Sequence, residues 1–356
     1  MRWDIFCQIV DNYGDAGVCW RLARSLSSIH GQTVRIFCDN LPTLNLLASG
    51  VHVDIKDKIQ LLPWESSFEN HRHQAQAPDV VIEAFGCQLP ERYLAGLLVA
   101  PKKPIIINLE YLSAEPWIVD FHGKSSPQSH GIPKYFFFPG FQDQAGGILI
   151  DPVPPSSPPS ISSIPASLEK VWSQLRPHAK RISIFCYPGA PLRKWLEDLA
   201  SLDQDFDILL THGHAELLGI NTGQAIQLPE HIQLHPLPFV SQDEYDWLLS
   251  QCDFNIVRGE DSFVRAQLAG KPFIWHIYPQ EDRAHEVKLA AFLDLYLEGA
   301  NQDLRLSTIA AMTWAMPSQW FGAIDAWSAH GEAWRAHLLK KQGGGGLAAR
   351  LLAFVG

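Results

Sequence analysis

The sequence has no long apolar run, no pairing pattern among its cysteines and no excess of basic residues, and each absence excludes a class of protein. No run reaches the roughly 18 residues of a membrane-spanning helix, and the N-terminus lacks the small-residue cleavage site of a signal peptide. The six cysteines have neither CxxC nor zinc spacing, which indicates reduced, mostly buried thiols in a cytoplasm. A net charge of −10 without a basic stripe excludes a nucleic-acid binder but suits a cationic partner. We therefore expect a cytoplasmic protein that binds neither membrane nor nucleic acid.

The composition is that of a globular protein with two domains. The chain has 356 residues, of which 46% are hydrophobic and 19% are charged. Residues 151–167, DPVPPSSPPSISSIPAS, contain six prolines and six serines and favour neither a helix nor a central strand. We interpret this segment as a linker between an N-terminal domain, residues 1–155, and a C-terminal domain, residues 156–334. A C-terminal helix at about residues 335–356 is expected to complete the first domain.

Short apolar runs alternate with helical stretches on both sides of the linker. Runs of this kind, rich in β-branched residues, are typical of parallel strands covered by helices on both faces. They are residues 3–10, 33–38, 80–83 and 104–109 in the first half, and 181–187, 206–212, 231–237, 254–259 and 272–278 in the second. The pattern predicts an α/β protein with two Rossmann-like domains facing a central cleft. Ligands of such sheets bind beyond the C-terminal ends of the strands, so the loops there are the candidates for a site.

The loop after the first strand, VDNYGDAG, carries two acids and two glycines just before a helix expected over residues 18–26. Asp11 and Asp15 lie in the turn that cradles a phosphate in many α/β enzymes. As purely structural residues, Asp15 would cap the helix and Asp11 would form the turn, but a cap needs neither a second acid nor two glycines. A later loop of this half, NLEYLSAE, adds Glu110 and Tyr111. Glu110 serves either a cationic ligand or a local cap or salt bridge.

A loop of the second half, VRGEDSF, combines a helix start with an acid. A helix is expected over residues 263–268, with Asp261 or Ser262 as its N-cap. The amides of the first turn and the positive end of the helix dipole form a ready site for a diphosphate. Glu260 would repel that ligand, so we expect it to serve another purpose.

Four stretches of the chain, DNYGDAGVCWRLAR, NLEYLSAE, FCYPGAP and VRGEDSFVRAQLAGKPFIWHIYPQEDRAH, carry a resemblance to a known family. Together they resemble the EarP family, bacterial protein-arginine rhamnosyltransferases that modify elongation factor P. The resemblance runs from residue 4 to about residue 335, so both domains take part. Tyr13 is a conservative departure from the phenylalanine of the family's DNFGD form.

The resemblance implies a GT-B fold and an inverting transfer of rhamnose from dTDP-β-L-rhamnose to one arginine of elongation factor P. It implies that this modification activates elongation factor P for the rescue of ribosomes stalled at polyproline. It also implies that the N-terminal domain meets the acceptor protein and that the C-terminal domain holds the nucleotide sugar. Enzymes of the GT-B type are generally metal-independent and no DxD motif stands at a strand end, so we expect no metal and no other cofactor.

An arginine acceptor explains the paired acids in chemical terms. A guanidinium is planar, has five donors and has a pKa above about 12, so a carboxylate of pKa about 4 does not deprotonate it when free. Two acids can orient the guanidinium and accept its proton as the new bond forms. We assign these roles to Asp11 and Asp15, with Asp15 as the base. The same loop supplies further substrate-binding candidates: Asn12, Tyr13, Gly14 and Gly17.

The thymine of the donor is expected on loops of the second half. Phe185 and Tyr187, on FCYPGAP, are candidates to flank the base, although aromatic residues of a strand are usually core. The resemblance supports Gln242, with Phe239 nearby, as a reader of the thymine edge.

The turn RGEDS is expected to hold the diphosphate and the sugar. Arg258 either binds the diphosphate or positions Glu260. Glu260, the third catalytic candidate, holds sugar hydroxyls or stabilises the positive charge that develops on the sugar. The remaining substrate-binding candidates of this turn are Gly259, Asp261 and Ser262. The histidines show no ligand spacing, and we interpret His212 and His214, in the sequence THGH, as an ordinary surface turn.

Two other classes of function share parts of this pattern. An NAD(P)-dependent oxidoreductase also has a strand, a glycine-containing turn and a helix, but DNYGDAG is not GxGxxG and its acids would repel a pyrophosphate. A non-catalytic regulator that binds a sugar nucleotide has little use for paired carboxylates.

Overall fold

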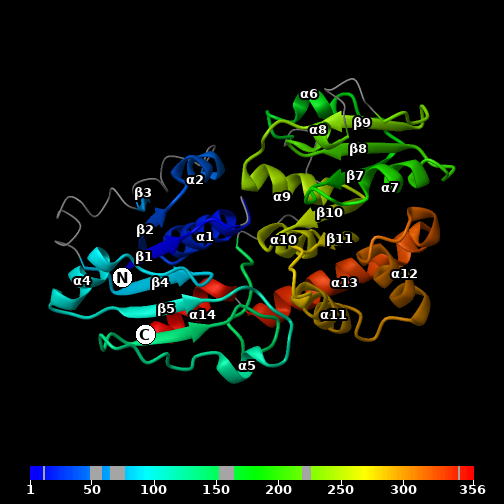
Figure 1. Cartoon of the computed structure of the whole chain (residues 1–356). Coiled ribbons are helices and arrows are strands. Elements are labelled where there is room, and N and C mark those ends of the chain that lie inside the picture. Colours follow the sequence, from blue (N-terminus) through cyan, green and yellow to red (C-terminus); the bar gives the residue numbers. More distant parts are fainter. Residues whose placement is uncertain (11–12, 49–57, 65–76, 152–163, 219–225, 344) are drawn as a thin grey trace. The chain divides into compact units, whose positions relative to one another are not determined.

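The computed structural model describes the chain except for residues 11–12, 49–57, 65–76, 152–163, 219–225 and 344 (Figure 1). The chain forms two compact units, Met1–Pro152 with Leu339–Gly356, and Val153–Leu338. The linker interpretation divides the chain at residue 155 and about residue 335, and most of the linker lies outside the described residues. In the described part of the chain, no helix is both long and apolar enough to cross a membrane.

The first unit contains a six-stranded, wholly parallel sheet in the order β3-β2-β1-β4-β5-β6. Its strands are β1 (Arg2–Cys7), β2 (Thr33–Cys38), β3 (Ile59–Pro63), β4 (Val80–Ala84), β5 (Ile105–Leu109) and β6 (Lys134–Phe137). Nearly every residue of β1, β2, β4 and β5 is buried, which is why these strands appear as continuous apolar runs in the sequence. The sequence prediction missed β3 and β6, the two edge strands, because most of their residues are only partly buried.

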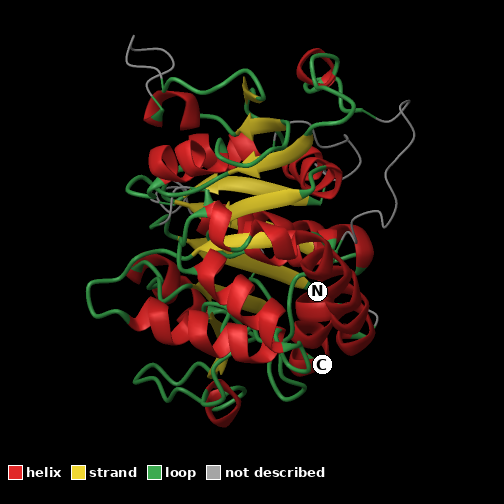
Figure 2. Ribbon diagram, turned by 90° about the vertical axis from the view of Figure 1, so that its right-hand side faces the viewer, coloured by secondary structure: helices red, strands yellow, loops and turns green. Residues whose placement is uncertain are grey.

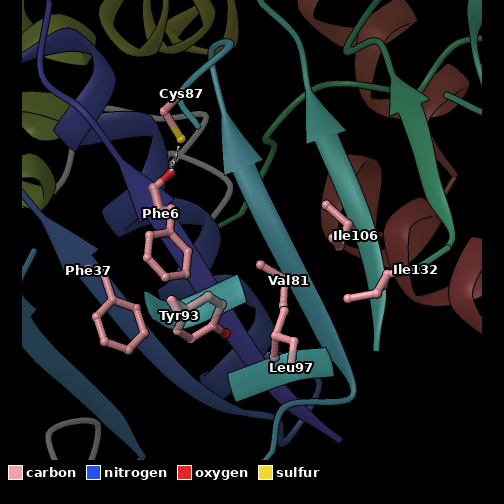
Figure 3. Close-up of a cluster of buried hydrophobic side chains, with 8 residues drawn as sticks. All are labelled: Phe6, Phe37, Val81, Cys87, Tyr93, Leu97, Ile106 and Ile132. Atoms are coloured by element: carbon pink, nitrogen blue, oxygen red, sulfur yellow. Dashed lines mark hydrogen bonds between the residues drawn. The ribbon is translucent and has the colours of Figure 1, made fainter. Parts of the chain in front are cut away.

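Helices and a hydrophobic core stabilise this sheet. The helices are α1 (Gly14–Arg24), followed by a π-helical turn at Ser25–Ile29, α2 (Leu41–Leu47), α4 (Glu91–Val99), α5 (Ile118–Phe121) and α14 (Gly346–Val355). In the core, the rings of Phe6 and Phe37 stack with their centroids 4.7 Å apart, and Tyr93 packs against both (Figure 3). The Tyr93 hydroxyl and the Arg35 guanidinium both donate to the buried Asp4 carboxylate, so its charge is compensated.

The C-terminal helix α14 belongs to the first unit. The Leu347 N–H donates to the Ile148 carbonyl oxygen (2.8 Å), and the Ile148 N–H donates to Gln342 Oε1 (3.1 Å). Gly346 begins the helix with φ +51°, and a Cβ there would lie 2.2 Å from the Ile148 oxygen. Glycine is therefore required where the chain returns to this unit.

The second unit contains a five-stranded parallel sheet in the order β11-β10-β7-β8-β9. Its strands are β7 (Lys180–Ile184), β8 (Phe206–Leu210), β9 (Ile232–Pro236), β10 (Phe254–Arg258) and β11 (Phe273–His276). Its helices are α6 (Glu169–Trp172), α7 (Leu192–Leu199), α8 (His214–Leu217), α9 (Gln242–Gln251), α10 (Asp261–Ala269), α11 (Ala284–Tyr296), α12 (Gln302–Met312) and most of α13 (Ile324–Gln342). Figure 2 shows the strands in yellow among red helices. All five strands predicted for this half are confirmed.

Each sheet has the strand order of a Rossmann fold. β1 lies between β2 and β4, and β7 lies between β8 and β10, so the strand order reverses beside the first strand of each unit. Ligands of such folds bind at this reversal, beyond the carboxyl ends of the strands. The loops that leave β1 and β4, and those that leave β7 and β10, therefore contain the primary candidates for binding sites.

Three predicted boundaries near these loops are wrong. β1 ends at Cys7 rather than at residue 10, because the Ile9 and Val10 N–H groups donate to aspartate side chains instead of a neighbouring strand. Helix α1 begins at Gly14 rather than at residue 18, since the glycine-containing turn is itself helical. Helix α10 begins at Asp261, so Glu260 precedes it and neither Asp261 nor Ser262 is its N-cap. The prediction of mostly buried free thiols is confirmed, since all six cysteines are free and buried.

Candidate functional site

Asp15 is a buried carboxylate held where β1 passes into α1. It is the second residue of the helix and is 3% exposed. Its Oδ2 accepts the Val10 N–H at 2.8 Å, and the Gly17 N–H closes the first helical turn on the Tyr13 oxygen at 2.8 Å. Asp15 therefore lies inside the helix rather than before it, at the end where the dipole favours a negative charge. The other acid of the loop, Asp11, and its neighbour Asn12 lie outside the described residues.

A second acid and an aromatic pair follow β4 and β5. Asn108 donates its amide N–H to Glu110 Oε1 at 2.5 Å, and burial raises the pKa of Glu110 above its ordinary value. The Tyr111 ring stacks on Phe85 with centroids 4.6 Å apart and is 38% exposed. Phe85 has φ +59°, a left-handed conformation that a bulky residue rarely adopts. An acid and a stacked ring pair with one exposed ring, beyond the carboxyl ends of two neighbouring strands, suit a cationic planar group.

Arg258 is the fixed cation of the second unit. It is the last residue of β10, and its guanidinium lies 4.3 Å from the ring centroid of Phe185 and 4.8 Å from that of Tyr187. Its Nη1 also donates to the Cys186 carbonyl oxygen at 3.3 Å. Phe185 and Tyr187, singled out in the sequence as partners of a base, thus also position the arginine.

Two histidines accept hydrogen bonds from the backbone of the loop that carries Phe185 and Tyr187. The Cys186 N–H donates to His214 Nε2 (2.9 Å), and the Tyr187 N–H donates to His276 Nδ1 (3.1 Å). Burial lowers the pKa of both imidazoles, that of His276 to about 4, and the nearby Arg258 charge acts in the same direction. The interpretation of His214 as part of an ordinary surface turn is wrong: its side chain turns inward to the loop backbone, and the residue is 3% exposed.

Glu260 has a partner that the sequence did not indicate. Lys288 of α11 donates to Glu260 Oε1 at 2.9 Å, and the two side chains are 20% and 15% exposed, respectively. The preceding Gly259 adopts φ +64°, and its carbonyl oxygen accepts the indole N–H of Trp275 at 2.9 Å. The acid at the start of α10 is therefore largely compensated by a lysine that the fold brings to it.

Gln242 and Asp261 meet at the starts of two helices. Gln242, the first residue of α9, is 6% exposed and donates from Nε2 to Asp261 Oδ2 at 3.1 Å. Behind them, Arg265 of α10 pairs with Asp246 of α9 at 2.8 Å, which ties the two helices together. Ser262 is also buried, in the first turn of α10.

The structure thus brings most of the second-unit candidates together at the carboxyl ends of the strands. Phe239 lies just before α9, partly buried, with its ring centroid 6.5 Å from that of His212. Sequence reasoning missed three residues of this site: His276, Tyr278 (whose ring centroid lies 5.3 Å from that of Tyr187) and Lys288. The first two could have been found, because they lie at or just after the end of β11, whereas Lys288 stands within a helix and carries no signal. Among the described residues, no group of three or more His, Cys, Asp or Glu side chains could hold a metal ion.

Solved structures with the same fold identify the class of protein. A structure described as the basis for EarP-mediated arginine glycosylation of translation elongation factor EF-P matches 99% of this chain and 98% of its own, with a TM-score of 0.63 and 30% identity. A UDP-GlcNAc 2-epimerase from Neisseria meningitidis, 12% identical with a TM-score of 0.57, shares the fold alone. The fold is that of a glycosyltransferase with two Rossmann-like domains, the GT-B type, as the sequence led us to expect.

The chain belongs to the EarP family. The model of the elongation factor P (EF-P) rhamnosyltransferase EarP matches residues 3–356. A protein-arginine rhamnosyltransferase from Pseudomonas putida is 40% identical over 349 residues, which cover 93% of this chain and 90% of the relative. Another from Neisseria meningitidis is 37% identical over 310 residues, 82% of this chain and 77% of the relative. The family resemblance stated from the sequence is confirmed.

Proposed function

We propose that this chain is a protein-arginine rhamnosyltransferase that transfers rhamnose from dTDP-β-L-rhamnose to an arginine of elongation factor P. The family match over residues 3–356 supports the transfer and the acceptor. The structural observation that carries the donor assignment is Arg258, a fixed cation between aromatic rings beside the start of α10. A cation next to a helix N-terminus suits the diphosphate of a nucleotide sugar.

The second unit binds the nucleotide in this proposal. Phe185 and Tyr187 flank the thymine, and Gln242, oriented by its bond to Asp261, accepts the N–H of the base edge through its amide oxygen. Arg258 and the first-turn amides of α10 hold the diphosphate, including the charge that develops on it as the sugar leaves. These groups supply the stabilisation for which other glycosyltransferases use a divalent cation, so we propose a reaction without metal.

Glu260 acts on the sugar. An acid beside the diphosphate site would repel the donor, but Lys288 offsets most of that repulsion. The carboxylate remains able to accept hydrogen bonds from sugar hydroxyls and to stabilise positive charge at the anomeric carbon. We assign it that role in the transition state.

The first unit binds the acceptor arginine. Asp15 is fixed by the Val10 N–H and lies at the positive end of α1, and we assign it the proton that the guanidinium loses as the new bond forms. We propose that Asp11 is the second acid that orients the guanidinium, and that Glu110 and Tyr111 extend the binding surface for this cation. We also assign Asn12, Tyr13 and the first-turn residues Gly14 and Gly17 of α1 to the acceptor arginine.

The reaction is a single displacement. The arginine nitrogen attacks the anomeric carbon and forms the C–N bond, while the bond from that carbon to the diphosphate oxygen breaks. The electron pair leaves with dTDP, and the proton of the attacking nitrogen passes to Asp15. One displacement inverts the anomeric configuration.

Calorimetry on the purified chain tests the donor assignment. We expect dTDP-β-L-rhamnose and dTDP to bind in the presence of a metal chelator, and UDP and NADH to bind at least tenfold more weakly or not at all. A chain that binds NADH in preference to dTDP would contradict the proposal and restore the oxidoreductase. A chain that binds dTDP only after a divalent cation is added would overturn the metal-free mechanism.

A further inference from the structure

The loop after β7 uses its own backbone N–H groups for internal hydrogen bonds. The Phe185 N–H donates to the Ile256 carbonyl oxygen of β10 at 2.8 Å. The next two N–H groups, of Cys186 and Tyr187, donate to His214 and His276. In many Rossmann folds the corresponding loop offers such groups to a phosphate. Here these three are engaged, so residues 185–187 offer a ligand their side chains rather than their backbone N–H groups.

His276 is placed to fix Tyr187 relative to Arg258. It pairs with Arg258 across β10 and β11, and its Nδ1 accepts the Tyr187 N–H at 3.1 Å. Its ring also meets that of Tyr187, with centroids 5.4 Å apart. An acceptor nitrogen carries no proton, so His276 is neutral, which agrees with its lowered pKa. A proton at Nδ1 would break the bond and add a second cation beside Arg258.

His214 fixes Phe185 and Cys186 in a similar way. Its Nε2 lies 2.9 Å from both the nitrogen and the carbonyl oxygen of Cys186, and its Nδ1 lies 3.0 Å from the Thr211 hydroxyl and 3.2 Å from the Thr211 carbonyl oxygen. In the tautomer in which Nε2 accepts the Cys186 N–H, Nδ1 donates to Thr211. The Phe185 ring meets the imidazole edge-on at 5.9 Å. Thr211 is in turn bonded to Ile184, the last residue of β7. The histidine therefore links the loop to the rigid end of the sheet.

We propose that His214 and His276 are positioning residues of the nucleotide-sugar site. They fix the conformation of the Phe185–Tyr187 loop. Its two rings and the Cys186 carbonyl oxygen in turn fix the position of the Arg258 guanidinium. This inference rests on the proposed function, since the loop and Arg258 are its donor-binding elements. Neither histidine touches the donor. Each accepts one backbone N–H of the loop, so a residue that restores the acceptor atom restores the site.

Paired variants test this role. In His276→Asn the amide oxygen can replace Nδ1, and in His214→Gln it can replace Nε2, whereas His276→Leu and His214→Leu fill space without an acceptor. We expect the leucine variants to raise the dissociation constant of dTDP-β-L-rhamnose by on the order of tenfold or more, because a buried N–H loses its partner. We expect the amide variants to stay within about threefold of the wild type. Because Arg258 also holds the charge that develops on the diphosphate, the turnover rate should fall in the leucine variants as well and recover in the amide variants.

His330→Leu is the matched control. His330 is a partly buried histidine of the same unit that bonds to the Tyr296 carbonyl oxygen at 2.7 Å, on α11 rather than on the donor loop. This variant should leave the donor dissociation constant unchanged. A folded His276→Leu or His214→Leu chain with wild-type donor affinity would overturn the proposal. So would an amide variant as impaired as its leucine counterpart, because packing rather than the acceptor atom would then be responsible.

Amide hydrogen exchange in the ligand-free chain provides a readout that does not depend on the donor. The Cys186 amide should exchange faster in His214→Leu and the Tyr187 amide faster in His276→Leu, with protection restored by the amide variants. Unchanged exchange would overturn the proposal even if affinity fell. A wild-type chain that binds no dTDP-β-L-rhamnose would overturn the proposed function, whereas normal wild-type binding with unaffected leucine variants would overturn this inference alone.

Discussion

Replacing Lys288 by methionine tests how this chain tolerates an acid beside a diphosphate site. The substitution keeps most of the side-chain volume but removes the cation whose Nζ lies 2.9 Å from Glu260 Oε1. Both side chains are mostly buried, so an effective dielectric constant of about 20 is appropriate. For a separation of roughly 6 Å between the uncompensated carboxylate and one unit of phosphate charge, the repulsion energy is about 3 kcal/mol. Salt and water reduce this energy to about 1–2 kcal/mol. We expect dTDP to bind about 5- to 30-fold more weakly.

Calorimetric titration of dTDP into a series of variants separates this effect from a loss of folding. Lys288→Met should bind dTDP more weakly than the wild type. Glu260→Gln should bind it equally or slightly more tightly, and the double variant should regain affinity close to that of the wild type, because the repelling charge is gone. A folded Lys288→Met chain with unchanged dTDP affinity would refute the electrostatic reasoning. Equal weakening in the single and the double variant would show that Lys288 acts by itself, for example by contacting the phosphate.

The remaining predictions concern the candidate sites of the two units. Asp15→Asn should abolish transfer and leave donor binding nearly unchanged, since the acid serves the acceptor; lost donor affinity by calorimetry would instead assign it to the donor site. Glu260→Gln should lower kcat and kcat/KM together, by on the order of 100-fold or more, because it acts in the transition state; near-normal turnover in a steady-state assay would remove it from the mechanism. Tyr187→Ala should weaken nucleotide binding without affecting acceptor docking, because Arg258 loses one of its two rings; unaltered donor affinity would make Tyr187 a core residue. His276 has a pKa of about 4 in the fold and about 6.5 in an unfolded chain, so the unfolded state binds more protons between these values. The neutral histidine therefore contributes about 3 kcal/mol to the free energy of unfolding above pH 6.5, and this contribution is lost as the pH falls to 4. In urea unfolding, the free energy of unfolding of His276→Asn should fall less steeply with decreasing pH than that of the wild type. Identical pH profiles would contradict the assignment.

The central strands of both units could be predicted because burial on both faces leaves a continuous apolar run. β5 is an example, with the sequence IIINL, in which four of the five residues are buried. The missed strands β3 and β6 are the edges of the sheet, where partial exposure weakens the apolar signal. The end of β1 and the start of α1 were predicted wrongly for a different reason. The Asp15 carboxylate competes for the Val10 N–H, and local propensity does not indicate that contact.

The candidate site was predictable where a strand end identifies it and not where two distant elements meet. Arg258, Glu260 and Asp261 follow a strong strand signal, and the family resemblance added Gln242. The pair between Lys288 and Glu260 joins a residue of α11 to the residue 28 positions earlier that precedes α10, so only the tertiary fold creates it. His214 was misread because THGH has the composition of an exposed turn, whereas the hydrogen bonds to Cys186 and Thr211 draw its side chain inward.

Mass spectrometry of elongation factor P after incubation with this chain and dTDP-β-L-rhamnose tests the central claim most directly. The account predicts that elongation factor P gains the mass of one deoxyhexose, that fragmentation locates it on a single arginine, and that a variant with lysine at that arginine gains nothing. The Asp15→Asn chain, matched in concentration and shown to be folded, should produce no modified protein. Elongation factor P that stays unmodified, in the presence of a wild-type chain shown to bind the donor, would contradict the account.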